Sequence, residues 1–132
     1  LTPTLNRGHY MHIPQIISTD EGSEYYFEEG CYIWEQSNSA VDEDLSIARA
    51  RVLANTATKR HKLANTTERY IILEGTGEVI LGENTITAVS KGDVVIIPPN
   101  CPQAINNTGT IDLVFMVLCT PRFVIENYSE CE

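Results

Sequence analysis

Two short segments of this sequence carry side chains that could hold a ligand or transfer a proton. His61 and Leu63 are two residues apart, so a β-strand would place both on one face. The next apolar segment begins with Glu68, and the same spacing puts Tyr70 and Ile72 on its face. If both faces point into one interior, an imidazole and a carboxyl group meet there beside an apolar wall. A buried carboxylate left unpaired is costly or becomes protonated, so we expect Glu68 to have a metal ion or a base as partner.

Each of these side chains also has a purely structural alternative. His61 can be hydrogen-bonded inside the fold without any ligand, and Tyr70 can act as an acid or base or simply pack. Arg49 and Arg51 lie on one side of their predicted strand. If that side faces inward, they could clamp a substrate carboxylate or phosphate through paired hydrogen bonds. If it faces outward, they pair with acidic residues elsewhere.

Charge is distributed unevenly along the 132 residues. The chain has 9 basic and 18 acidic residues, a net charge of −9, which argues against nucleic acid or an anionic membrane surface as partner. Nine acids and no base lie between Asp20 and Asp44, and six bases with one acid follow up to Arg69. This pattern indicates two solvated faces that attract each other. The alternative is a basic barrel mouth that draws in a small anionic substrate.

Other signatures of enzyme chemistry are missing from the sequence. It contains no G-x-S-x-G, no P-loop, no dinucleotide-binding fingerprint and no H-E-x-x-H. The four cysteines form no C-x-x-C pair, so we expect reduced, scattered thiols. A Cys101–His nucleophile stays open, although an isolated cysteine in a turn is usually a small apolar residue. The sequence shows no signal peptide and no run of eighteen apolar residues, so we expect a cytoplasmic protein that does not span a membrane.

The periodicity of the chain predicts an all-β fold in a single domain. Apolar residues make up 42%, enough for a sizeable core. Short alternating or β-branched segments recur about every ten residues, which is typical of a sandwich or barrel. Glu74–Gly77 predicts a hairpin turn. We expect a barrel core over about 45–121 and an N-terminal arm over 1–44, with strands at 28–36, 45–53, 68–73, 79–81, 85–89, 94–97, 103–105 and 112–119.

Two longer motifs resemble those of the cupin superfamily. The first runs from Thr58 to Gly75 and contains a histidine, a glutamate seven residues later and then, after six further residues, a glycine. The second runs from Gly92 to Asn107 with Pro98 between them. The resemblance covers Leu45 to about Pro121 and implies a cupin-type double-stranded β-helix, a jelly-roll barrel. The closing segment is similar to that of small single-domain cupins with no settled activity.

The resemblance also implies a metal site, which this sequence alters. Metal-binding cupins typically use three histidines and a glutamate, and the matching positions here hold His61, Leu63, Glu68 and Gln103. The other two histidines, His9 and His12, lie near the N-terminus. A neutral imidazole, a carboxylate and an amide oxygen form a mixed donor set that suits Mn, Fe, Ni or Zn with open water positions. Gln103 is the weakest of these ligands.

Two hypotheses from different classes follow. In the first, His61, Glu68 and Gln103 hold one divalent transition metal in an oxygenase, isomerase or lyase of a small polar or anionic metabolite. In that enzyme, Leu63, Ile72 and Ile105 would exclude water. In the second, the barrel is a metal-free ligand-binding or regulatory cupin, because two histidine positions are lost. Fold alone does not decide between them.

Apolar residues on the outside of one predicted strand indicate assembly. Ile71 and Leu73 would lie on the outer face of their strand, where exposed apolar rows invite pairing. The resemblance to small cupins implies a homodimer, formed by packing these faces or by exchanging N-terminal strands.

Overall fold

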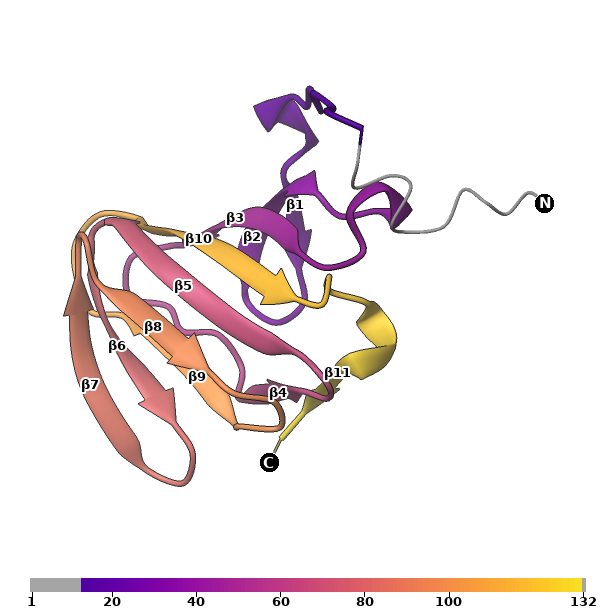
Figure 1. The fold of residues 1–132 in the computed structure, drawn as a ribbon. Coiled ribbons are helices and arrows are strands. Elements are labelled where there is room, and N and C mark those ends of the chain that lie inside the picture. The colour runs from indigo at the N-terminus through magenta and orange to yellow at the C-terminus, as the bar shows by residue number, and fades with distance from the viewer. Residues whose placement is uncertain (1–12, 132) are drawn as a thin grey trace.

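Short segments, most of them containing β-branched residues, form eleven strands within residues 13–131, the part of the chain described by the computed structural model. They build two antiparallel sheets that face each other (Figure 1). Of three 3-10 helices, one precedes β1 and two connect strands, and none of the helices in this range has the length and apolarity to cross a membrane. The six-stranded sheet has the order β1 (Tyr25–Phe27), β2 (Cys31–Ser37), β3 (Ser46–Val52), β10 (Leu113–Thr120), β5 (Thr67–Glu74), β8 (Val94–Ile97). The five-stranded sheet has the order β11 (Tyr128–Glu130), β4 (His61–Leu63), β9 (Gln103–Asn107), β6 (Thr76–Leu81), β7 (Thr85–Ser90). The helices are η2 (Glu21–Ser23), η3 (Ala40–Asp42) and η4 (Ile125–Asn127).

The strands expected from periodicity are all present. The expected strand 94–97 coincides with β8, and the other ends differ by at most three residues. Two strands were not expected, β1 and β11, and each has only three residues. The segment expected as an N-terminal arm supplies β1 and β2 to the larger sheet. All four cysteines are free thiols, as expected.

The turn at Gly75 was expected to close a hairpin, and that expectation is wrong. β5 belongs to the larger sheet and β6 to the smaller one, so the turn passes the chain from one sheet to the other. Gly75 has a φ of +86°, and a Cβ atom there would lie 2.8 Å from the carbonyl oxygen of Asp112. Glycine is required because the left-handed backbone and the close approach both exclude a side chain. The Gly82–Asn84 turn does join a true hairpin, β6 with β7.

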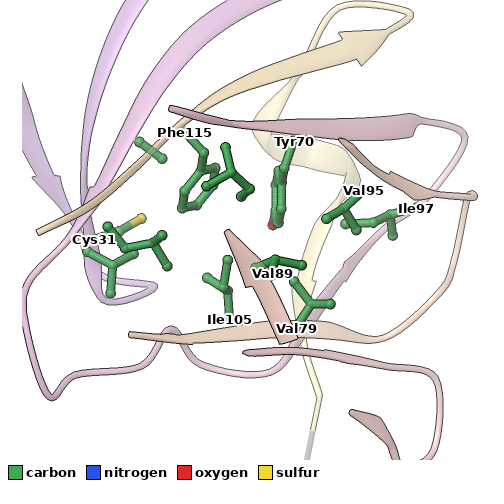
Figure 2. Packing of buried hydrophobic residues seen from close by; sticks show 12 residues of the cluster. Cys31, Tyr70, Val79, Val89, Val95, Ile97, Ile105 and Phe115 are labelled. Carbon is green, nitrogen blue, oxygen red and sulfur yellow. The ribbon is translucent and has the colours of Figure 1, made fainter. Parts of the chain in front are cut away.

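The hydrophobic core fills the space between the sheets (Figure 2). Successive side chains of a strand point to opposite faces of its sheet, so each strand contributes about every second side chain to the core. In contrast, Ile71 and Leu73 are 36% and 38% exposed on the outer face of β5. The core cluster comprises Cys31, Ala50, Val52, Tyr70, Ile72, Val79, Val89, Val95, Ile97, Ile105, Leu113 and Phe115.

Asn107 closes the smaller sheet against the larger one. Its side chain is 1% exposed, and its amide donates to the carbonyls of Val52 at 2.9 Å and Ile111 at 2.8 Å. Its own oxygen accepts from the Gly109 amide at 2.8 Å. We expect Asn107→Ala to lower the free energy of unfolding by roughly 3 kcal/mol, because buried backbone groups lose their partners. Urea unfolding measures this loss. The matched control is Asn106→Ala on the other face of β9, and equal losses in both variants would contradict the prediction.

Candidate functional site

The three residues expected to form a site all point into the barrel. His61, Glu68 and Gln103 are 2%, 8% and 1% exposed. His61 on β4 and Gln103 on β9 are direct cross-strand partners, so their side chains project to the same side of the smaller sheet. Glu68 comes from β5 in the opposite sheet. The two facing sheets therefore bring these side chains into one interior.

Glu68, Gln103 and Tyr70 form a hydrogen-bonded chain. The Gln103 Nε2 donates to Glu68 Oε1 at 2.7 Å, and the Tyr70 hydroxyl donates to Gln103 Oε1. Tyr70 shares the inner face of β5 with Glu68 because they are two residues apart. The Tyr70 ring packs against the Phe115 ring, with the ring centroids 4.5 Å apart (Figure 2). Both ends of the Gln103 amide are thus used to fix the positions of a carboxyl group and a phenol.

His61 is paired with Glu29, a residue that the motifs in the sequence do not single out. The Nδ1 atom of His61 lies 2.8 Å from the Lys59 carbonyl oxygen, so Nδ1 carries a proton and donates it there. The Nε2 atom lies 3.4 Å from Glu29 Oε1. The Tyr128 ring stacks on the imidazole with centroids 5.2 Å apart. The imidazole is therefore fixed in orientation, with Nε2 facing the carboxyl group of Glu29.

The hairpin between β1 and β2 brings Glu29 into the barrel. Its turn ends at Gly30, which has a φ of +114°. A Cβ atom at this position would lie 3.0 Å from the Ala57 carbonyl oxygen, so the backbone conformation and the close contact leave no room for a side chain. The Lys59 amide donates to the Glu29 carbonyl at 2.7 Å, which holds the turn against the segment before β4. The Glu29 side chain is 13% exposed as a result. In the sequence this residue is one of nine acids in an apparently solvated stretch, and only the adjacent Gly30 distinguishes it.

Glu29 and Glu68 line a cavity of about 70 Å³ inside the barrel. Tyr70 and Cys119 also line it, and its other walls are mainly apolar. His61 and Gln103 are not among the lining residues, and each contacts one of the two acids from behind. The two acids are therefore the groups presented to a molecule inside the cavity.

Burial shifts the proton affinities of these groups. It raises the pKa of Glu29 to about 8, with the nearby Glu68 charge adding to the effect, and raises the pKa of Glu68 to about 7 against the Gln103 hydrogen bond. It lowers the pKa of His61 and raises that of Tyr70 well above its usual range. Near neutral pH the histidine is neutral, Glu29 is largely protonated, and Glu68 is divided between its two forms. Such a pair suits general acid–base chemistry.

The arrangement does not fit the metal site that the resemblance implies. The Gln103 oxygen accepts from Tyr70, Glu68 Oε1 accepts from Gln103, and His61 Nε2 faces Glu29. The Gln103 oxygen and Glu68 Oε1 therefore already accept hydrogen bonds and His61 Nε2 faces an acid, whereas among the described residues Glu68 Oε2 has only the Cys119 thiol as a partner, at 4.0 Å. Among residues 13–131, no group of three or more His, Cys, Asp or Glu side chains is placed to hold a metal ion. His9 and His12 lie outside the described residues.

Arg49 and Arg51 are on the outer face of β3, away from this cavity. Arg51 donates to Glu24 at 2.7 Å and to Asp112 at 3.0 Å, and Arg49 pairs with Glu21 and Glu24. The Arg51 hydrogen bond is the main reason that the pKa of Glu24 falls below its usual value. Both arginines therefore face outward and form ion pairs with the acidic stretch.

The three apolar residues expected around the site lie in the protein interior. Leu63, Ile72 and Ile105 are 4%, 1% and 0% exposed, and the last two belong to the core cluster. None of the three lines the cavity, whose walls near Glu68 come from other side chains. Phe27, Ile33, Ala50, Phe115 and Val117 form much of that apolar wall.

Comparisons with known proteins agree with this architecture. One curated relative, an uncharacterized protein of Methanocaldococcus jannaschii, is 37% identical over 82 residues, 62% of this chain. The matched region spans 65% of that relative's own length. KdgF from Halomonas sp. shares the fold with a TM-score of 0.71 at 17% identity, covering 84% of this chain and 96% of its own.

A second similar structure is that of Streptomyces PAC13, a tyrosine-to-phenylalanine variant with uridine. It has a TM-score of 0.75 at 12% identity and covers 90% of this chain and 93% of its own. The family model of the cupin domain matches residues 49–119, more than half of the chain. These residues include His61, Glu68 and Gln103, and the two facing sheets are those of a double-stranded β-helix. The chain therefore belongs to the cupin family.

Proposed function

We propose that this cupin binds a small molecule inside the barrel and moves protons on it with Glu68 and Glu29, without a metal ion. The observation that carries the proposal is the arrangement of four side chains at the cavity. Two nearly buried carboxyl groups line it, while His61 and Gln103 hold them from behind. In the other hypothesis from the sequence, a metal ion held by His61, Glu68 and Gln103 would compete with the Gln103–Glu68 and Tyr70–Gln103 hydrogen bonds and with the contact between His61 Nε2 and Glu29.

The two acids can take different roles because their environments differ. Glu68, with the lower pKa of about 7, is the general base, and Glu29, with a pKa of about 8, is the general acid. Gln103 and Tyr70 position Glu68, and His61 positions Glu29. Removing a proton at one atom and supplying one at another is the requirement of isomerisation and elimination. These are the two reaction classes, among those considered from the sequence, that this pair supports best.

The structural neighbours support a small-molecule ligand in general terms. PAC13, which has a similar fold and covers most of this chain, was determined with uridine. The cavity is small and its walls are largely apolar, so a small barrel of this kind has room for one modest ligand. A compact molecule with a polar group for the two acids and apolar carbons for the walls fits this space best.

Solvent deuterium tests the proposed chemistry even though the substrate is unidentified. The protein is incubated in D₂O with pooled small metabolites, and mass spectrometry identifies any compound that gains deuterium at carbon. We expect such a compound, and we expect its labelling to require Glu68. Binding without labelling would support the metal-free binding hypothesis and contradict catalysis.

Elemental analysis tests the metal-free part separately. We expect well under one metal ion per chain, both as purified and after incubation with Mn, Fe, Ni or Zn, because the Gln103 oxygen and Glu68 Oε1 already accept hydrogen bonds and an amide is a weak ligand for these metals. His61→Ala and Glu68→Gln should leave the metal content unchanged. One bound metal per chain that both substitutions abolish would contradict the proposal and favour the metal-dependent hypothesis.

A further inference from the structure

The cavity contains acids and no bases. Glu29 and Glu68 line it, and Glu35, which is exposed, is also among its lining residues. None of the described residues that line it is Lys, Arg or His. Anions therefore meet no compensating charge inside, whereas a positively charged guest meets two carboxyl groups. The expectation of an anionic substrate depended on Arg49 and Arg51 facing the interior, and they face outward.

Aromatic rings form a large part of the cavity wall. Tyr25, Phe27, Tyr70, Phe115 and Phe123 all line it, from strands of the larger sheet and from the segment after β10. The face of an aromatic ring attracts an ammonium group, and this attraction strengthens when water is excluded. The carboxyl groups and the aromatic rings that line this cavity are independent features, and both favour a cation over a neutral or anionic guest.

Each buried acid also has one oxygen with little to bind. Among the described residues, the hydrogen-bond partner of Glu68 Oε2 is the Cys119 thiol at 4.0 Å, and that of Glu29 Oε2 is the Cys31 thiol at 3.6 Å. A thiol is a weak hydrogen-bond donor, and burial keeps both thiols protonated by raising their pKa. These oxygens therefore keep acceptor capacity that a ligand N–H group can satisfy.

We propose that the cavity binds a small organic cation, a primary or secondary ammonium compound, with its nitrogen between Glu68 and Glu29 and its carbon atoms against the aromatic wall. This inference rests on the proposed interior ligand site and names the class of its ligand. A cavity needs about 10–15 Å³ to hold one water-sized group, so a cavity of about 70 Å³ holds about five non-hydrogen atoms. A larger substrate would extend past Glu35, the exposed acid that lines the cavity.

Three probes of similar size test the charge preference: isobutylammonium, isobutanol and isobutyrate. Binding to the full chain is measured at neutral pH and constant salt by NMR titration. We expect isobutylammonium to bind at least about tenfold more tightly than the other two. Equal or tighter binding of the alcohol or the carboxylate, or no binding of the amine at about 100 mM, would overturn the inference.

Variants locate the binding in the cavity. Glu68→Gln and Glu29→Gln each keep side-chain size, and each should weaken isobutylammonium binding at least about tenfold while changing isobutanol binding little. Glu83→Gln, at the exposed turn between β6 and β7, is the matched control and should change neither. Phe123→Leu removes an aromatic ring without changing the charge, and it should weaken binding of isobutylammonium more than binding of isobutanol.

The cation inference and the proposed function can fail independently of each other. If isobutanol binds best and shifts cavity residues such as Tyr70, the cation inference fails while an interior ligand site remains. If deuterium labelling is independent of Glu68, the proposed chemistry fails whatever the probes show. Amine binding that persists unchanged in both Glu→Gln variants would place the amine elsewhere and overturn the inference.

Discussion

Glu29→Gln is expected to raise the free energy of unfolding by at most about 5 kcal/mol near pH 9 and to change it little near pH 5. The folded protein holds the Glu29 proton up to a pKa of about 8, whereas the ordinary value is 4.5. Between these two values the folded state binds more protons than the unfolded state, so wild-type stability falls as pH rises. Above about pH 8 the full cost of the buried charge is present. Glutamine carries no charge, and its amide can donate to His61 Nε2 in place of the acid.

Urea unfolding at a series of pH values measures this effect. Trp34, the single tryptophan, provides the fluorescence signal. The stability difference between variant and wild type should open between about pH 5 and pH 8 and then stay constant. Glu83→Gln should follow the wild type at every pH. Parallel curves for Glu29→Gln and wild type would mean that Glu29 is ionised in the folded protein without cost.

Glu68→Gln is expected to slow deuterium incorporation into the substrate at least about 100-fold, the usual contribution of a positioned general base. The amide can still hydrogen-bond to Gln103, so the cavity should keep its shape and the rate of labelling should fall further than the loss of ligand binding expected from removing the charge. Tyr70→Phe removes the hydroxyl that holds the Gln103 oxygen and should cause a smaller loss, since Tyr70 positions Gln103. Glu83→Gln again serves as the control.

The pH dependence of labelling gives a second readout. The base form of Glu68 appears as pH rises through about 7, and the acid form of Glu29 disappears as pH rises through about 8. The rate should therefore peak between these values, with both limbs belonging to the coupled pair. A Glu68→Gln variant that labels the substrate at the wild-type rate would contradict the assignment of the base.

The sheet architecture could be predicted from the sequence because alternation and turn residues are local signals. Val94–Ile97 is β-branched and bounded by Gly92-Asp93 and Pro98, and it forms β8 with the expected ends. The same reasoning gave the wrong partner at Gly75, since a glycine turn marks a change of direction without specifying which sheet receives the next strand. β1 and β11 were missed because three residues carry too little periodicity to detect.

The site was predictable only in part, and for a physical reason. The inward direction of His61, Glu68 and Gln103 follows from strand alternation and from the family resemblance. Their hydrogen bonds do not, because these depend on distances between opposite sheets. Glu29 was hidden for a further reason: a buried acid in a stretch of surface acids has the same residue type as its neighbours. Its pKa is set by burial, which composition does not report.

One half of the acid pair comes from outside the matched domain. Glu29 belongs to the hairpin that precedes residues 49–119, whereas Glu68 lies within them. A related protein could therefore keep the entire barrel motif and still differ in chemistry by one hairpin tip. Grafting or exchanging residues 25–37 offers a route to reprogramming this scaffold, since it replaces an acid in the cavity while leaving the inner positions of the matched region untouched.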